Sequence, residues 1–287
     1  MSLSDWMASE NIPGIYGVDT RRLVKRIRQQ ESAMVGAIST SPAAVKQKVH
    51  WNQQPKQYGP AQWSCGNCEG LPGGCIRILV LDFGLKHGIV SKLLDLSNNS
   101  QIEISISPGS TTELEAEMKK KPFHGLLLSN GPGDPKNQRF AIAQLQKLFS
   151  GPSTLSEFLP ILGICLGHQL ISLAAGGGSS KLKFGHRGHN HPVVFSKDTK
   201  LGFISSQNHG FFTTFDFLRD WAPLYTNLND NTSAGIYHRS RPIMSSQWHP
   251  EGGGGPKEVG IFKAFFNSVK EYAASGRVNA SWPPGDE

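Results

Sequence analysis

A cysteine stands between two glycines at the junction of an apolar run and a helical pattern, in the segment Pro160-Ile-Leu-Gly-Ile-Cys-Leu-Gly-His-Gln-Leu-Ile-Ser-Leu-Ala174. Gly163 and Gly167 lie two residues before and after Cys165. Because neighbouring side chains would collide in a tight strand-to-helix turn, glycine on both sides favours such a turn. The turn is predicted to expose the sulfur at a positive helix N-terminus and to aim backbone N–H groups at a developing oxyanion. On this segment alone, an inert buried cysteine is the equal alternative.

A second segment supplies the partners that a reactive cysteine needs. Residues 241–248 are predicted to form a short strand with His249 at its carboxyl end, where the sites of open α/β sheets assemble. A cysteine nucleophile requires a base, and the base requires an orienting acceptor. In extended geometry Glu251 projects from the same face as His249, and Pro250 fixes the backbone between them. The cysteine turn and the His-x-Glu pair together indicate a Cys–His–Glu catalytic site.

The chain beyond residue 75 alternates short apolar runs with amphipathic stretches. The runs are Ile76–Phe83, Ile102–Ile106, Gly125–Ser129 and Ile161–Ile164. Strands that alternate with helices in this way predict an α/β fold, with a mainly parallel open sheet and helices on both faces. We expect this domain to span residues 76–272 and to be followed by a flexible tail over 273–287. Residues 41–75 are polar and rich in Pro, Gly and Gln, which is typical of a linker.

The first 40 residues form a separate small part that contains a basic helix. Asp19-Thr20 is a good N-cap for it, and its basic residues are Arg21, Arg22, Lys25, Arg26 and Arg28. We interpret them as a solvated helix face, because neither interleaved aromatic residues nor a nucleic-acid-binding motif accompanies them. The sequence therefore predicts no nucleic-acid partner, although the formal net charge is +7.

The composition restricts the class of protein. A hydrophobic content of 38% over 287 residues is enough for a packed core. No apolar run approaches the length of a membrane span, and the N-terminus lacks the apolar region of a signal peptide. Four cysteines, one of them a candidate reactive thiol, suit a reducing compartment. We therefore expect a cytoplasmic protein without membrane contact, with a mitochondrial location as the alternative.

Further motifs carry a resemblance to a known family. They are Leu126-Leu-Leu-Ser-Asn-Gly-Pro-Gly-Asp-Pro135, Lys183-Phe-Gly-His-Arg-Gly-His-Asn-His-Pro192 and Ser206-Gln-Asn-His-Gly-Phe211. With the cysteine turn and the His-x-Glu pair, they closely resemble the triad (class I) glutamine amidotransferases, specifically the glutaminase domain or small subunit of carbamoyl-phosphate synthetase. The segment Asp220–Asp230 is similar to the eukaryotic, pyrimidine-pathway version. Residues 1–40 resemble the end of that subunit's N-terminal domain.

The resemblance assigns roles to individual residues. Cys165 becomes the nucleophile, His249 the base and Glu251 its orienting carboxylate. The glutamine-binding residues it implies are Gly131, Gly133, Leu166, Gln169, Asn208, Gly210 and Phe211. Two backbone N–H donors, from Leu166 and from the glycine turn, would stabilise the oxyanion, and the two turn glycines would let the backbone approach the substrate. Gln169 and Asn208 can pair with the substrate's α-amino and α-carboxylate groups.

The implied activity is hydrolysis of glutamine to glutamate and ammonia, which a synthetase large subunit or fused synthetase domains would use for carbamoyl phosphate synthesis. No cofactor is expected for this chain, since ATP, Mg²⁺ and bicarbonate would be used by the synthetase partner. One alternative is a triad amidotransferase of another biosynthetic pathway. Another is a catalytically silent module that keeps the fold for binding a partner.

Two further clusters raise the question of a metal site. They are the histidines His186, His189, His191 and His209, and the cysteines Cys65, Cys68 and Cys75. Three cysteines without an obvious fourth ligand make a poor zinc site, and they lie in the predicted linker, so we interpret them as reduced surface thiols. We expect the histidines to serve backbone or loop contacts within the family motif, and we predict no structural metal.

The N-terminal part departs from the family pattern. The match to the N-terminal domain begins near the end of that domain, so the resemblance implies an N-terminally truncated chain that retains only its last helix and strand. Such a remnant is too small to bury a core of its own. Its apolar residues are therefore expected to lie exposed or to pack loosely: Leu3, Trp6, Ile12, Ile15, Leu23 and Ile27. We also expect this part to be protease-sensitive and its truncation to weaken glutamine binding.

Overall fold

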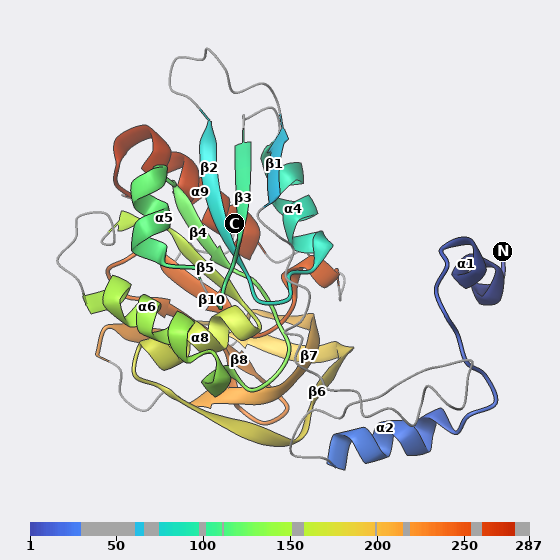
Figure 1. Ribbon diagram of the computed structural model, residues 1–287. Coiled ribbons are helices and arrows are strands. Elements are labelled where there is room, and N and C mark those ends of the chain that lie inside the picture. Colours follow the sequence, from blue (N-terminus) through green and yellow to red (C-terminus); the bar gives the residue numbers. More distant parts are fainter. Residues whose placement is uncertain are drawn as a thin grey trace. The chain divides into compact units, whose positions relative to one another are not determined.

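The structure is a computed structural model that describes residues 1–29, 61–65, 75–97, 102–110, 112–150, 158–198, 200–214, 219–253 and 260–278 (Figure 1). The chain divides into two compact units, Met1–Gln53 and Gln54–Glu287. Among the described residues, no helix has the length and apolar character needed to cross a membrane.

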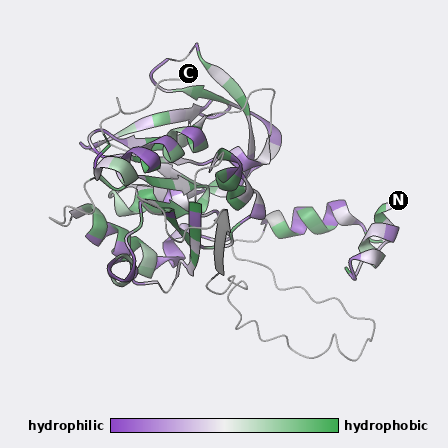
Figure 2. Ribbon diagram, turned by 90° about the horizontal axis from the view of Figure 1, so that it is seen from above, coloured by the Kyte–Doolittle hydropathy of each residue, from purple (hydrophilic) through white to green (hydrophobic). Residues whose placement is uncertain are grey.

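Within its described residues 1–29, the first unit contains two short helices, α1 (Leu3–Ser9) and α2 (Thr20–Gln29). Asp19 caps α2 as predicted, because its Oδ1 accepts a hydrogen bond of 2.9 Å from the N–H of Arg22. Hydrophilic and hydrophobic residues alternate along α2 (Figure 2). The apolar residues named above are all exposed: Leu3, Trp6, Ile12, Ile15, Leu23 and Ile27. The prediction that this part buries no core of its own is therefore confirmed for the described residues.

The second unit is built around one sheet. Its strands are β1 (Ala61–Cys65), β2 (Ile76–Asp82), β3 (Ile102–Pro108), β4 (Gly125–Leu128), β5 (Ile161–Ile164), β6 (Gly178–Phe195), β7 (Gly202–Thr214), β8 (Trp221–Asn227), β9 (Ser233–His238) and β10 (Ile243–Ser246). The helices are α4 (His87–Ser97), α5 (Leu114–Lys120), η1 (Pro135–Asn137), α6 (Arg139–Ser150), α8 (Leu166–Ala174), η2 (Pro250–Gly252) and α9 (Ile261–Ser275). The strand order is β1-β3-β2-β4-β5-β10-β9-β8-β6-β7.

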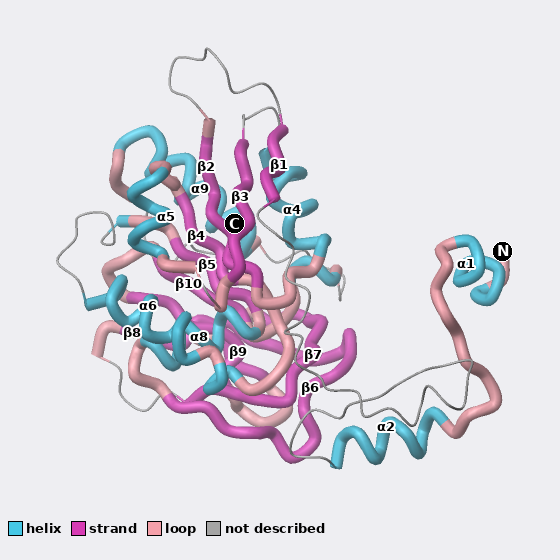
Figure 3. The backbone as a smooth tube through the Cα atoms, viewed as in Figure 1, coloured by secondary structure: helices cyan, strands magenta, loops and turns pink. Residues whose placement is uncertain are grey.

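The centre of the sheet is parallel and covered by helices on both faces (Figures 1 and 3). Strands β3, β2, β4, β5 and β10 pair in parallel. Successive residues of β2 point to opposite faces, so that Ile78 packs in one core cluster with α4 and α9, while Leu79 packs in the other with α6 and α8. The apolar runs predicted as strands are thus confirmed, and so is the α/β fold class.

The other half of the sheet was not anticipated from the sequence. Strands β9, β8, β6 and β7 continue from β10 in antiparallel pairing. The predicted strand over residues 241–248 is also shorter than expected, because β10 ends at Ser246 and His249 lies three residues beyond it. His249 is held instead by the antiparallel half, since its N–H donates to the carbonyl of Ser206 in β7 over 2.8 Å.

The predicted linker contains a strand. Ala61–Cys65 alternates apolar and polar residues and forms β1, which pairs antiparallel with the edge of β3. Cys75 directly precedes β2, and its side chain is buried and disulfide-bonded. The expectation of a reduced surface thiol is therefore wrong for Cys75, whereas Cys165 is a free thiol. Cys68 lies outside the described residues.

Candidate active site

Cys165 occupies a strained turn between β5 and α8. Its φ of 54° and ψ of −101° are unfavourable for any residue with a side chain. A Cβ on Gly167 would lie 2.3 Å from the carbonyl oxygen of Leu128, and a Cβ on Gly163 would lie 2.7 Å from Gly167 itself. The predicted need for both glycines is confirmed. The prediction of an exposed sulfur is wrong, because Cys165 is only 4% exposed and the site is enclosed.

His249 links the cysteine to the carboxylate. Its Nδ1–H donates to Glu251 Oε1 over 2.7 Å, and its imidazole also interacts with the Cys165 side chain. Burial lowers the pKa of His249, but the hydrogen bonds and charges of Cys165 and Glu251 outweigh that effect and raise the pKa to about 9. At neutral pH the imidazolium form of His249 is therefore favoured beside the sulfur.

The Glu251 side chain, in η2, is only 3% exposed and has a second cationic neighbour. Lys86 Nζ lies 3.5 Å from Glu251 Oε1 and 3.4 Å from His249 Nδ1. Since Nδ1–H already donates to the carboxylate, the ammonium pairs with Glu251 and not with the imidazole. Burial raises the pKa of Glu251, but the hydrogen bond and charge of His249 and the charge of Lys86 lower it below its usual range. Sequence reasoning missed Lys86, which lies just beyond the carboxyl end of β2.

The glycine turn after β4 touches the cysteine turn. A Cβ on Gly131 would lie 2.3 Å from the Phe83 carbonyl oxygen and 2.7 Å from Leu166 Cδ2. Gly133 has a φ of +93°, which only glycine adopts readily. The N–H of Gly167 donates to the Ser129 carbonyl, whereas the preceding amide, that of Leu166, starts α8 and has no acceptor within the helix. These contacts place the predicted oxyanion donors beside Cys165.

Gln169 lies one turn beyond Cys165 on α8 and is buried. Its Nε2 donates to the Phe211 carbonyl and to Gln247 Oε1, each over 3.0 Å. Both amide hydrogens are therefore used within the protein, and only the oxygen, an acceptor, remains for a ligand. Of the two pairings predicted for Gln169, these hydrogen bonds are compatible with an α-amino group as partner and not with an α-carboxylate.

Strand β7 brings the other predicted binding residues to the triad. The main chain of β7 contacts both His249, through Ser206, and Gln169, through Phe211. Asn208 is exposed, whereas its neighbour His209 is buried, so the two side chains lie on opposite faces of the strand. Gly210 follows, close to Arg187 of β6. Among the described residues, the Asn208 side chain forms no hydrogen bond with Cys165, His249 or Glu251.

His168 is a site residue that sequence reasoning missed. It is fully buried on α8, and its ring contacts Ser245 Oγ of β10 at 2.9 Å and Thr213 Oγ1 of β7 at 3.0 Å. Burial lowers its pKa to about 3, so the ring is neutral. His168 thus ties the helix that carries Cys165 to both halves of the sheet. Its place three residues after Cys165, on a helix whose other residues are mostly apolar, was the available signal.

The histidines that suggested a metal site have other partners. His186 contacts Asp230 and Asn227, and His191 contacts Asn229. His189 contacts Ser206, and His209 contacts Phe211 and Gln207. The expectation that they serve loop and backbone contacts is confirmed. Among the described residues, no three ligating side chains converge on a metal position.

Comparison with known proteins identifies the family. The glutamine amidotransferase class-I family matches residues 79–269, and the CPSase domain of the carbamoyl-phosphate synthase small chain matches residues 1–38. The carbamoyl phosphate synthase small chain of Thermus thermophilus is 37% identical over 94% of this chain and 70% of its own length. This chain belongs to the family of carbamoyl-phosphate synthase small chains. The arginine-specific small chain of Aspergillus clavatus is 35% identical, with coverage of 96% of this chain and 58% of its own length.

A solved structure shares the fold. It is a protein from Thermoplasma acidophilum described as part of a GMP synthase, and it matches 70% of this chain and 96% of its own with a TM-score of 0.55 and 23% identity. At that identity the likeness extends to the fold alone. The family membership therefore rests on the sequence relatives, and the fold on both comparisons.

Proposed function

We propose that this chain hydrolyses glutamine to glutamate and ammonia, as the glutaminase component of a carbamoyl-phosphate synthase. The observation that carries the proposal is the connected row Cys165–His249–Glu251 on a strained turn, in a chain that belongs to the small-chain family. A thiol, a base and an orienting carboxylate in this order are what nucleophilic amide hydrolysis requires.

The chemistry follows from the geometry. The sulfur of Cys165 attacks the side-chain amide carbon of glutamine, and the carbonyl oxygen becomes an oxyanion that the Leu166 N–H and the glycine turn can stabilise. The imidazolium of His249 then donates its proton to the departing nitrogen, so that ammonia leaves and a γ-glutamyl thioester remains. Neutral His249 next takes a proton from water, and the resulting hydroxide attacks the thioester carbon. The carbon–sulfur bond then breaks, and glutamate departs from a free Cys165 sulfur and a protonated His249.

The groups of the substrate that do not react would be held by α8 and β7. The oxygen of Gln169 is an acceptor for the α-ammonium. The Asn208 side chain, exposed on β7, can donate to the α-carboxylate. The backbone groups that would line the glutamine site are those of Gly131, Gly133, Gly210 and Phe211. Because Cys165 supplies the nucleophile and His249 carries out the proton transfers, we propose that this half-reaction needs no cofactor.

The relatives are named small chains, which supports a larger synthetase partner for this chain. We propose that ammonia passes to that partner, which would use ATP, Mg²⁺ and bicarbonate to form carbamoyl phosphate. We expect the rate of glutamine hydrolysis to rise when the synthetase partner is bound and turning over. A free glutaminase would show no such dependence on a partner.

Within the family we infer the eukaryotic pyrimidine-pathway type and a cytoplasmic location. The segment Asp220–Asp230 supports the pyrimidine pathway, because it is similar to the pyrimidine-pathway version. The relatives include arginine-specific small chains, which makes the arginine pathway the alternative. Disruption of the gene decides between the pathways. If the disrupted strain requires uracil for growth, the inference is supported, and if it requires arginine alone, the inference is contradicted. Fractionation of cells tests the cytoplasmic location separately.

The decisive assay is glutamate release from glutamine, alone and with a synthetase partner, for the wild type and Cys165→Ser. We expect release by the wild type and none by the variant. A correctly folded wild-type chain that releases no glutamate with any synthetase partner would support the alternative of a silent partner-binding module.

A further inference from the structure

The β7 segment that carries Asn208 is held by a short block of strand pairs. Strands β6 and β7 pair as His186↔His209, Arg187↔Asn208 and Gly188↔Gln207, and the register shifts on both sides of this block. Only three residue pairs lie between the two register shifts, so this block specifies the β6–β7 register weakly. A slip of β7 by one residue would turn the Asn208 side chain to the buried face of the sheet. The orientation of Asn208 therefore depends on side chains that anchor the block.

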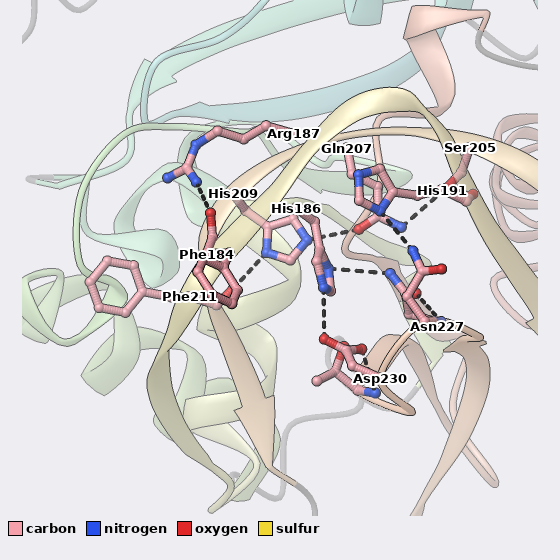
Figure 4. A network of polar contacts seen from close by, with 12 residues as sticks. Phe184, His186, Arg187, His191, Ser205, Gln207, His209, Phe211, Asn227 and Asp230 are labelled. Carbon is pink, nitrogen blue, oxygen red and sulfur yellow. Dashed lines mark hydrogen bonds and ion pairs between the residues drawn. The ribbon is translucent and has the colours of Figure 1, made fainter. Parts of the chain in front are cut away.

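His186 anchors one strand of the block to the turn between β8 and β9 (Figure 4). The Asn227 amide has a fixed orientation because its Oδ1 accepts the N–H of Asn229 over 2.9 Å, which leaves its Nδ2 to donate to His186 Nδ1 over 3.2 Å. Nδ1 is therefore an acceptor, and the proton of the neutral ring lies on Nε2. Nε2–H donates to Asp230 Oδ2 over 2.7 Å.

Asp230 is itself held firmly. Its Oδ1 accepts the backbone N–H and the hydroxyl of Thr232 at 3.1 and 2.7 Å. Burial raises the pKa of Asp230, but the hydrogen bonds from Thr232 and the contact with His186 outweigh it and lower the pKa below its usual range. The carboxylate is thus ionised near neutral pH, and a charge-assisted hydrogen bond holds the His186 ring.

The His186 ring in turn packs on His209 of the facing strand. The ring centroids are 4.9 Å apart at an interplanar angle of 85°. His209 is buried, and burial lowers its pKa to about 3, so it is neutral. Its Nδ1–H donates to the Phe211 carbonyl over 2.7 Å, the same carbonyl that accepts from Gln169. A continuous set of contacts therefore runs from Asp230 to the helix that carries Cys165.

We propose that Asp230 and His186 are positioning residues for glutamine binding, which fix the β7 segment 208–211 in the register that presents Asn208 to the substrate. The inference rests on the proposed function. Neither residue touches Cys165, His249 or Glu251 through any contact among the described residues, so their effect falls on substrate binding and not on the triad.

The test compares variants that break the anchor with variants that keep it. Asp230→Ala removes the acceptor, and His186→Phe keeps a ring against His209 but removes both hydrogen bonds. His186→Gln retains an amide that can donate to Asp230 and serves as the rescue. Asn229→Ala is the matched control from the same turn, because, in the part of the chain that the structure describes, the Asn229 side chain forms a hydrogen bond with His191 and none with His186 or Asp230. Each variant is assayed with its synthetase partner for kcat and KM, and for the alkylation rate of Cys165 by iodoacetamide.

Loss of a hydrogen bond to a charged group corresponds to about a tenfold change in binding. We expect the KM for glutamine to rise about tenfold in Asp230→Ala and His186→Phe, with kcat and the alkylation rate within about twofold of the wild type. His186→Gln and Asn229→Ala should stay close to the wild-type KM. An unchanged KM in His186→Phe, or kcat and alkylation that fall together with binding, would overturn the proposal. Failure of the proposed function itself is distinct, because the wild type would then release no glutamate.

Discussion

The two halves of the sheet contribute to the candidate site in different ways. The parallel half places its residues at strand ends: Cys165 follows β5, the glycine turn follows β4, and His249 lies beyond β10. The antiparallel half contributes Asn208 to Phe211 from within β7. The residues of the proposed chemistry thus come from the parallel half, while the two halves share the proposed substrate contacts, with Asn208, Gly210 and Phe211 supplied by the antiparallel half.

The halves also hold their residues by different means. In the parallel half the backbone does so, through the strained φ of Cys165 and the direct contact of Gly167 with the main chain at Leu128. In the antiparallel half, side-chain hydrogen bonds hold β7, above all those of His186 and His209. The comparison teaches that changes in the parallel half should affect turnover, while changes in the antiparallel half should affect binding.

The largest effect is expected from His249→Asn, which removes the acid–base group of the parallel half. General acid–base catalysis contributes about 10²–10⁴-fold, so kcat should fall by a factor in that range while KM changes little. Steady-state glutamate release with the synthetase partner measures both. A fall in kcat of less than about tenfold would mean that His249 is not the base.

An intermediate effect is expected from Asn208→Ala, the matching change in the antiparallel half. Its proposed partner is the α-carboxylate, at the end of the substrate that does not react, so KM should rise about tenfold with a smaller fall in kcat. Asn190→Ala, at an exposed position of β6, is the control and should leave both constants unchanged. If Asn208→Ala lowered kcat alone, the division between the two halves would not hold.

The smallest effect is expected from Glu251→Gln, which orients the base without transferring protons. The carboxylate helps raise the pKa of His249 to about 9, and the imidazolium must donate a proton to the departing ammonia. Activity should therefore decline as pH rises through about 9 in the wild type. In the variant the pKa of His249 is lower, so the decline should begin at lower pH, with a modest fall in kcat at neutral pH. A pH profile of kcat with an unmoved alkaline limb would exclude the orienting role.

The sequence predicted the parallel half well because its strands are buried on both faces and read as continuous apolar runs, as in Ile161–Ile164. The Cys165 turn was predictable for a local reason, since two glycines and one helix start define it. Strands β6 to β9 were not anticipated, because β6 carries glycines and histidines whose partners lie far away in the sequence, such as Asp230 for His186.

Other features depend on spatial neighbours that no local pattern encodes. Lys86 approaches Glu251 from a distant part of the sequence, and His168 contacts Thr213 and Ser245 on two different strands. The enclosure of Cys165 depends in the same way on the residues packed around it. The sequence named the predicted ligand Gln169, but only its hydrogen bonds to Phe211 and Gln247 show which end of the amide is available.

The central claim is that Cys165 is the nucleophile of an amide hydrolysis, and trapping of the covalent intermediate tests it most directly. The wild type and Cys165→Ala would be mixed with labelled glutamine, quenched in acid within the first turnover, and examined by peptide mass spectrometry. We predict a γ-glutamyl adduct on the peptide that contains Cys165 in the wild type, and none in the variant, which should keep the fold. Glutamate release without such an adduct, or release that persists in Cys165→Ala, would contradict the account.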